Sequence, residues 1–165
     1  MIGCFIDDLS SAFEEASFNI GVYRQDEISG ILESGGLCDM FPMICYEYSE
    51  ESRFECDMSE SKFLTDSIHK GTWIVGYGEY GIMFIMSIKD NKRMLDIDAF
   101  EVNKDERGSG VGTLVAKTVE DVACRYYDSL WVSPYDSKAE RFWKKMGFSD
   151  SLYGVLIKSL DGCHL

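Results

Sequence analysis

The sequence predicts a mixed α/β fold, an α+β arrangement with a mixed sheet, in which an antiparallel meander of strands is followed by a β-α-β-α-β tail. Three observations support this prediction. Consecutive apolar runs with strand alternation fill residues 72–102, a helical periodicity begins at residue 111, and a second helix and a last strand follow it. A strand joined to the next by a helical crossover runs parallel to it, so the sheet should be mixed.

The first seventy residues give weaker patterns. Ser11 and Glu14 have the spacing of a capping box, which predicts a short helix to about Phe18. A second helix is expected at 26–34, where a glycine pair ends it, and a third at 60–70. The segment between them is apolar enough for a strand at 40–48, which Pro42 would confine to a sheet edge.

The pattern becomes regular after residue 71. Strands at 72–77, 82–88 and 93–102, with turns at 78–81 and 89–92, predict two consecutive hairpins. Apolar positions 111, 114, 115, 119 and 122 form one face of a helix that ends near Arg125. A short strand at 129–133 should follow, then a helix that buries Ala139, Phe142, Trp143 and Met146, and a final strand at 153–160.

Composition and length favour one packed domain over residues 1–165. Hydrophobic residues make up 45% of the chain, and no apolar run reaches the roughly 20 residues that a membrane span requires. The start lacks the basic flank of a signal peptide, so we expect a cytoplasmic protein without a membrane partner. Six cysteines without C-x-x-C spacing and two histidines predict reduced thiols and no metal site.

The acidic charge is concentrated in the first part of the chain. The net charge is −13, and residues 1–70 hold 15 Asp or Glu against 4 Lys or Arg. Such a field repels nucleic acid and attracts cations, so we expect no nucleic-acid partner. A polyamine, an aminoglycoside-like compound or a Lys-containing peptide fits this charge better. The alternative is that the acidic residues only keep the protein soluble.

The most informative motif is a glycine-rich loop at residues 107–112, Arg-Gly-Ser-Gly-Val-Gly, between a predicted strand and a predicted helix. Glycines let the backbone approach an anion closely, and the first amides of a helix point at such an anion. Arg107 adds a side chain that can donate two hydrogen bonds to phosphate oxygens. The motif predicts a diphosphate site, although the glycines could also serve only a tight turn.

Two motifs together resemble the GCN5-related N-acetyltransferase (GNAT) superfamily over residues 72–160. The first is the family's Arg/Gln-x-x-Gly-x-Gly/Ala loop, present as Arg107, Gly110 and Gly112, five residues after Val102. The second is its N-x-x-A-x-x-F-Y-x-x-x-G-F segment, which reads here Asp136, Ala139, Phe142, Trp143, Gly147 and Phe148.

The resemblance implies a fold, a donor and a reaction. An acetyl group would pass from acetyl-CoA to a primary amine by direct attack, without a covalent enzyme intermediate, and residues 1–70 would form the acceptor side. The backbone of Phe100 and Val102 would bind the pantetheine arm, and the amide of Phe100 or its neighbour would bind the thioester oxygen. The pyrophosphate would lie on the loop, and Asp136, which replaces the family's Asn, would also contact the cofactor. The residues implied for the loop are Arg107, Gly108, Ser109, Gly110, Val111, Gly112 and Thr113.

The catalytic groups follow less directly. An alkyl ammonium must lose a proton before it attacks, and some family members carry a Glu base six residues before the position of Val102, which here is Asp96. Strand alternation predicts that Asp96 and Asp98 share a face with Phe100 and Val102; both are candidates, as base or as anchors of the ammonium. Trp143 replaces the family's Tyr and fits core packing, so the leaving thiolate would take its proton from Tyr135 or from solvent.

Two other functions stay open at this stage. The fold could belong to a catalytically weak or inactive acidic protein that binds a basic partner, because the family's Tyr and the Pro of its V-x-P motif are replaced here, by Trp143 and Lys104. A generic nucleotide-binding domain is a third hypothesis, although antiparallel hairpins before the glycine loop do not fit a Rossmann unit. The sequence leaves the oligomeric state undecided, a homodimer included.

Overall fold

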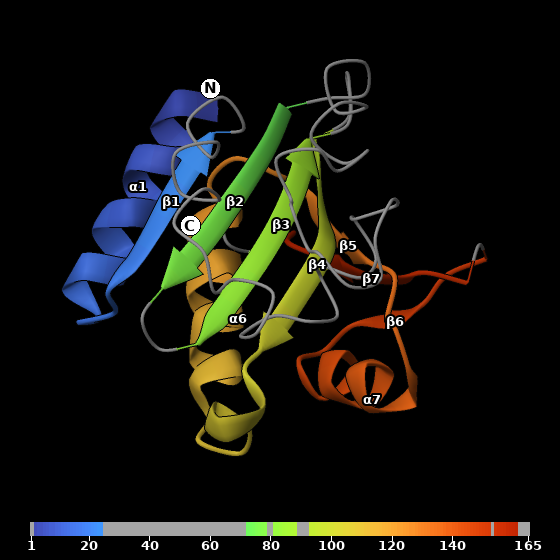
Figure 1. The fold of residues 1–165 in the computed structure, drawn as a ribbon. Helices are drawn as coiled ribbons and strands as arrows, with labels where there is room; N and C mark the ends of the chain where they lie inside the picture. The colour runs from blue at the N-terminus through green and yellow to red at the C-terminus, as the bar shows by residue number, and fades with distance from the viewer. Residues whose placement is uncertain (1, 25–71, 79–80, 89–92, 153, 162–165) are drawn as a thin grey trace, which may run out of the picture.

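A computed structural model describes residues 2–24, 72–78, 81–88, 93–152 and 154–161 of the chain. Seven strands form one sheet in the order β1-β2-β3-β4-β5-β7-β6 (Figure 1). In chain order, the elements are α1 (Ile2–Glu15), β1 (Ile20–Arg24), β2 (Thr72–Gly78), β3 (Ile82–Ile88), β4 (Met94–Val102), the 3-10 helix η4 (Lys104–Glu106), α6 (Val111–Ala123), β5 (Ser129–Val132), α7 (Ser137–Lys145), β6 (Ser149–Asp150) and β7 (Leu156–Ser159).

The sheet is mixed, as the sequence predicts. Strands β1 to β4 pair antiparallel, β4 and β5 pair parallel, and β7 pairs antiparallel with both β5 and β6. The helical crossover α6 joins the parallel pair, which agrees with the rule that parallel neighbours need such a connection. The three predicted strands of the meander and both predicted helices of the tail are confirmed.

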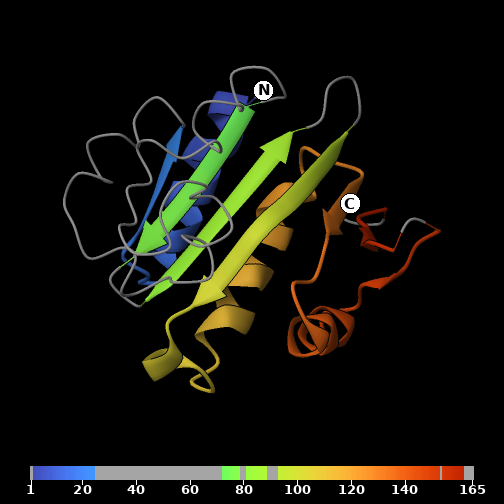
Figure 2. The ribbon, with the colours of Figure 1, turned by 45° about the vertical axis from the view of Figure 1, so that its right-hand side comes forward.

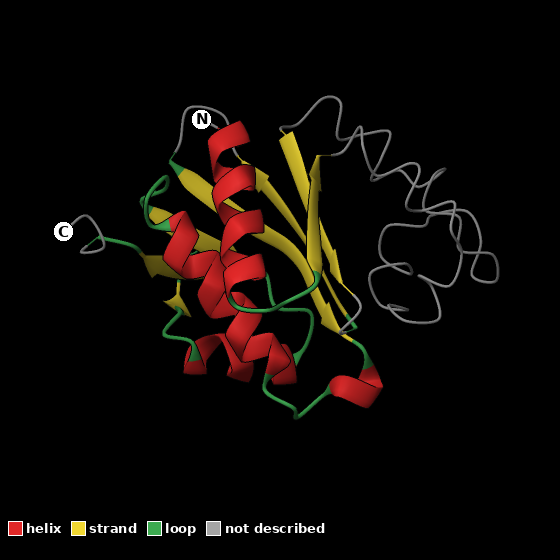
Figure 3. Cartoon of the chain, turned by 90° about the vertical axis from the view of Figure 1, so that its left-hand side faces the viewer, coloured by secondary structure: helices red, strands yellow, loops and turns green. Residues whose placement is uncertain are grey.

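One face of the sheet is covered by helices. Figure 3 shows α1 and α6 side by side on that face. The Phe13 ring on α1 lies 6.0 Å from the Phe84 ring on β3, and Phe5 meets Tyr127 edge-on at 5.2 Å. Burial of these rings and of the apolar face of α6 supplies the hydrophobic contribution to folding. The core therefore lies between the two helices and the sheet.

A polar contact also joins the two helices. The Tyr126 hydroxyl, just beyond α6, donates a hydrogen bond of 2.7 Å to the Asp8 carboxylate on α1, and the Arg125 guanidinium lies 3.3 Å from the same oxygen. The hydrogen bond to Asp8 is the main cause that raises the pKa of Tyr126 to about 12.

The predicted start of the first helix is wrong. Ser11 does not cap a helix but lies inside α1, where its hydroxyl donates to the Asp7 carbonyl at 2.9 Å. The buried positions Phe5, Ile6, Leu9 and Phe13 have the helical period, so amphipathicity rather than the capping signal defines this helix. Strand β1 was not predicted. The elements expected at 26–34, 40–48 and 60–70 lie outside the described residues.

A β-bulge in β4 changes which residues share a face. Ile85 of β3 pairs with Ala99 and the next residue, Met86, pairs with Ile97, so the register skips Asp98, which is the inserted residue of the bulge. Side chains before and after such a residue are out of alternation.

The bulge corrects the predicted face of the candidate base. Phe100 and Val102 pair with Phe84 and Ile82, which belong to the core. Asp96 instead pairs with Ser87. Ser87 lies an odd number of residues from Phe84 and Ile82 along β3, so Ser87 and Asp96 point to the opposite face of the sheet. The expectation that Asp96 shares a face with Phe100 and Val102 is wrong, because simple alternation assumes that no residue is inserted.

Strands β4 and β5 separate after four pairs. Met94 to Ile97 pair with Ser129 to Val132, and no further register is formed between these strands among the described residues. Figure 2 shows β4 and the chain that follows β5 running apart toward α6 and α7. The edge of β4 from Asp98 to Val102 that faces β5 is therefore left without a strand partner in the described part of the chain.

No described helix is long and apolar enough to cross a bilayer.

Candidate active site at the open edge of β4

Two adjoining cavities lie along this open edge. The outer cavity, of about 500 Å³, lies between the end of β4, the glycine loop and α7. The inner cavity, of about 300 Å³, lies between the bulge of β4 and the residues after β5. Five residues line both cavities: Phe100, Glu101, Tyr135, Ala139 and Trp143. The two spaces therefore form one cleft that runs from the glycine loop to the β4 bulge.

The glycine loop presents unoccupied amides to the outer cavity. Gly108 and Gly110 have φ of +86° and +88°, a backbone conformation that favours glycine, and a Cβ built on either would meet nothing within 4 Å. Gly110 is the N-cap of α6. In the described structure, the amides of Gly108, Gly110, Gly112 and Thr113 donate to no protein acceptor. Four donors at a helix N-terminus next to open space can bind an anion.

Gly112 serves a different purpose from the glycines before it. A Cβ at this position would lie 3.2 Å from Val102 Cγ2 and 3.7 Å from Phe100 Cε1. The first turn of α6 therefore packs tightly against the end of β4, and a larger residue would push the helix away from the strand. This contact fixes the distance between the loop and the open strand edge.

Arg107 is held at the base of the loop. Its Nε donates to the Val102 carbonyl at 2.9 Å, and its Nη2 lies 3.9 Å from a carboxylate oxygen of Glu101. The side chain lines the outer cavity and is 54% exposed. Because Nε is already used, only the terminal guanidinium nitrogens can reach an anion on the loop. That Arg107 binds phosphate stays a prediction.

Asp136 has a structural role that the sequence comparison with the family did not anticipate. Its Oδ1 accepts hydrogen bonds from the amides of Lys138 at 2.9 Å and Ala139 at 2.8 Å, so it is the N-cap of α7. These bonds, with that from Ala139 the larger cause, lower the pKa of the carboxyl below its ordinary value. Asp136 also lines the outer cavity, where cofactor contact stays a prediction.

We expect Asp136→Ala to destabilise the chain at neutral pH and to have little effect in acid. The carboxyl binds protons more weakly in the folded state, so its contribution is complete above the unfolded pKa of about 3.9 and is lost as the pH falls through the folded value. Urea unfolding of the native chain and the variant at several pH values measures this. A stability difference that stays constant down to acid pH would contradict the capping role.

A second polar contact holds α7 against the sheet. Lys158 Nζ on β7 donates to the Met146 carbonyl at the end of α7 at 2.6 Å, and it lies 2.6 Å from the Glu120 carboxylate on α6. One partly buried ammonium therefore joins both helices of the tail to β7, which fixes the far wall of the cleft.

Trp143 lies in the core, as its position in the helical stripe predicts. Its ring is 4% exposed and meets Phe100 at 5.2 Å and Phe148 at 5.1 Å, both edge-on. Tyr135, by contrast, is 60% exposed and lines both cavities. A phenol at this junction could give a proton to a leaving group in either cavity, so its assignment as the acid stays a prediction.

The carboxylates of β4 differ in their relation to the cleft. Asp96 lines neither cavity, Asp98 lines the inner one, and Glu101 lines both. Glu101 was missed in the sequence. The signal that could have revealed it is a charged residue between the apolar Phe100 and Val102 in a predicted strand. In the structure, Glu101 is a buried carboxylate, 5% exposed.

The arrangement of a mixed sheet that opens beside a glycine loop at a helix N-terminus defines a class of acyl-transfer folds that includes the GNAT enzymes. The family model of the GNAT acetyltransferases matches residues 37–148, and the chain belongs to this family. No curated protein matches the chain in sequence.

Solved structures with this fold include several acetyltransferases. One, described as "AtaTR bound with AcCoA", has 13% identity and a TM-score of 0.53 over 88% of this chain and 96% of that chain. An acetyltransferase of the GNAT family from Staphylococcus aureus Mu50 has 14% identity and a TM-score of 0.53 over 86% of this chain and 99% of that chain. Nourseothricin acetyltransferase has 20% identity and a TM-score of 0.40 over 55% of this chain, and the match spans only 64% of that chain. At these identities the two structures with a TM-score of 0.53 show a shared fold and nothing more.

The expectation that nucleic acid is excluded as a partner is not borne out by any comparison. Two further matched structures, with TM-scores of 0.48 and 0.47, are described as an AtaT–AtaR complex bound to DNA and a KacTA–DNA complex. Those descriptions concern those proteins.

Proposed function

We propose that this chain is an N-acetyltransferase that transfers an acetyl group from acetyl-CoA to a primary amine of a cationic acceptor by direct attack. One observation carries the proposal: four residues around the start of α6, whose amides donate to no acceptor in the described structure, line a cavity of about 500 Å³ that continues along the open edge of β4. A diphosphate fits the amides, and an extended arm fits the strand edge. The likeness to an acetyl-CoA-bound structure supports acetyl-CoA as the donor.

Each part of the donor would have its own partner in the cleft. The loop from Gly108 to Thr113 would hold the pyrophosphate, with the Arg107 guanidinium beside it. The backbone of Phe100 and Val102 would bind the pantetheine arm as a strand would, since their edge toward β5 has no strand partner among the described residues. An amide at or next to Phe100 would bind the developing oxyanion.

The inner cavity supports a cationic acceptor. The charged residues that line it, among those described, are Asp98 and Glu101, both acidic. An ammonium entering from this side would meet carboxylates, whereas a carboxylate substrate would be repelled. A polyamine, an aminoglycoside-like compound and a Lys-containing peptide share this charge. We extend the proposal to a single domain over 1–165 in the cytoplasm, with residues 1–70 on the acceptor side.

Thiol release tests the proposal directly. The purified chain is given acetyl-CoA with polyamines, aminoglycosides, amino acids and Lys-containing peptides in turn, and the free thiol and the mass of each amine are measured. We expect thiol release that depends on an amine, with an acetyl group added to that amine. Salt-sensitive capture of a basic protein without thiol release from any amine would favour the inactive binding module instead.

A further inference from the structure

We propose that Glu101, and not Asp96, is the carboxylate that takes the proton from the ammonium of the acceptor. The proposal rests on the proposed function, because it names the base for that reaction. It is carried by the separation of β4 from β5, by the position of Glu101 on both cavities and by its contact with Arg107.

The separation of β4 from β5 decides which carboxylates line the cleft. Asp96 and Glu101 pair with Ser87 and Met83 and so share the face opposite the core. Asp96 lies where β4 is still paired with β5, and it lines neither of the two cavities. Glu101 lies after the bulge, on the part of β4 that has separated from β5, and it lines both cavities. The open edge therefore places Glu101 along the cleft and leaves Asp96 outside it.

The position of Glu101 matches the place where donor and acceptor would meet. It lines the outer cavity, which the donor would occupy, and the inner cavity, which is acidic. Its chain neighbour Phe100 lines both cavities as well and would provide the nearby backbone for the thioester. Asp98 lines only the inner cavity, farther from the glycine loop. Among the β4 carboxylates, Glu101 is the one at the junction.

A buried carboxylate needs a compensating charge to stay ionised, and Arg107 provides it. The side chain of Glu101 is 4% exposed, and the guanidinium Nη2 of Arg107 lies 3.9 Å from its Oε1. A buried charge without such a partner would be costly and would tend to take up a proton. With this partner, the charge of the buried carboxylate is compensated, and a carboxylate within reach of the ammonium can act as its general base.

The step balances as a direct transfer. A proton leaves the ammonium for the Glu101 carboxylate, and the neutral amine nitrogen forms a bond to the thioester carbonyl carbon. The nitrogen of the adduct, now positively charged, loses a second proton to water. The carbon–sulfur bond breaks, and the thiolate leaves with its electron pair and takes a proton from water or from Tyr135. Glu101 returns its proton to solvent through the cleft, and Tyr135, where it has donated, regains one from solvent, so the enzyme is unchanged after each turnover.

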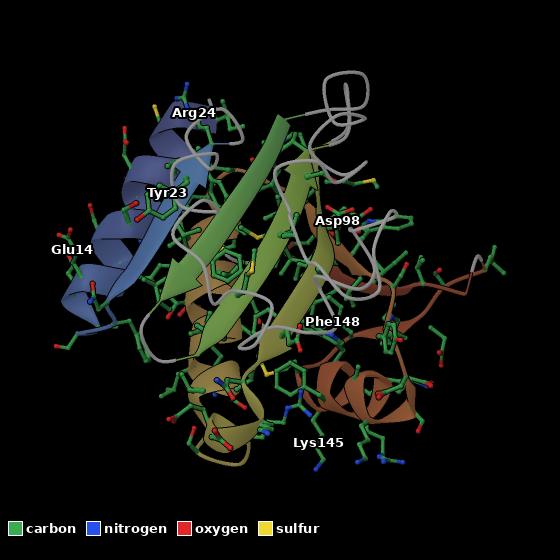
Figure 4. All side chains as sticks on the ribbon, in the orientation of Figure 1. Glu14, Tyr23, Arg24, Asp98, Lys145 and Phe148 are labelled. Carbon is green, nitrogen blue, oxygen red and sulfur yellow. The ribbon has the colours of Figure 1, made fainter. Side chains whose placement is uncertain are left out.

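Glu101→Gln tests the assignment, because it keeps the shape of the side chain and removes its ability to take a proton. At saturating acetyl-CoA and neutral pH we expect kcat to fall by about 10²–10⁴-fold, with recovery as the pH rises toward the pKa of the amine. Glu14→Gln is the matched control and should keep the parent kcat, because Glu14 lies on α1, lines neither cavity and is well apart from Asp98 in Figure 4. Asp96→Asn should also retain most of the turnover.

A weakly basic amine as acceptor distinguishes a catalytic role of Glu101 from a structural one. Such an amine is already neutral at the assay pH and needs no base, so Glu101→Gln should slow its acetylation far less than that of an alkyl amine. Calorimetry should show that the variant still binds acetyl-CoA. Equal losses for both amines, an unchanged kcat, or a large loss in Asp96→Asn or Asp98→Asn instead would overturn the assignment. Failure of the proposed function itself would differ, because the parent chain would then release no thiol with any amine.

Discussion

The double variant Arg107→Ala plus Gly110→Ala should lose coenzyme A binding by about 10²–10⁴-fold. Gly110 has φ of +88°, where an alanine is strained by roughly 1–2 kcal/mol, and its new methyl group would point into the space that the anion needs. Removal of the guanidinium takes away a charged donor worth about 1.5–3 kcal/mol. The sum corresponds to the expected loss in Kd, which titration calorimetry with coenzyme A measures.

A glycine elsewhere in the chain provides the matched control. Gly154, between β6 and β7, also has a positive φ, +72°, and a Cβ there would meet nothing within 4 Å. Gly154→Ala therefore introduces the same kind of backbone strain away from the cleft, and it should leave the affinity for coenzyme A unchanged. If the double variant binds coenzyme A as tightly as the parent, the loop is only a tight turn and the donor site proposed for this chain is wrong.

The glycine loop could be predicted because local sequence determines it. A strand, three glycines in five residues and an amphipathic helix describe the observed turn, and Gly108 and Gly110 have the positive φ that glycine permits. The mixed sheet was predictable for a similar reason, since each strand and helix of the tail has its own period. Leu114 is an exception, because it lies at a helical position that periodicity assigns to the core and is 53% exposed.

The carboxylates of β4 show where local patterns fail. The run from Met94 to Val102 reads as one uninterrupted strand, and nothing in it marks Asp98 as an inserted residue. A bulge depends on how the neighbouring strand is paired, which is a tertiary property. One inserted residue moves Asp96 to the face opposite Phe100 and Val102, which alternation in the sequence does not predict. Glu101 shares that face, and it lines the cleft because it lies beyond the segment of β4 that is paired with β5. The separation of β4 from β5 is likewise visible only once both strands are placed.

The second large effect concerns Trp143, which is part of the core and of both cavities. We expect Trp143→Ala to lower the free energy of unfolding by about 3–5 kcal/mol, because a ring that is 4% exposed and packed against Phe100 and Phe148 leaves a large void when it is removed. The wall of the cleft would collapse or loosen as well, so coenzyme A should bind more weakly in the fraction that stays folded. Urea unfolding measures the first effect and calorimetry below the unfolding midpoint the second.

Two further variants separate the role of the ring from the loss of any tryptophan. Trp131 on β5 is half-buried and lines neither cavity, so Trp131→Ala should cost less stability and leave coenzyme A binding unchanged. Trp143→Phe keeps an apolar ring and should restore part of the stability. A loss below about 1 kcal/mol in Trp143→Ala would mean that the cleft wall does not need this ring. Residue 143 is the position of the family's Tyr. A small loss of stability would therefore indicate that the Trp143 side chain is not needed for core packing and that it is available to contact the leaving group instead.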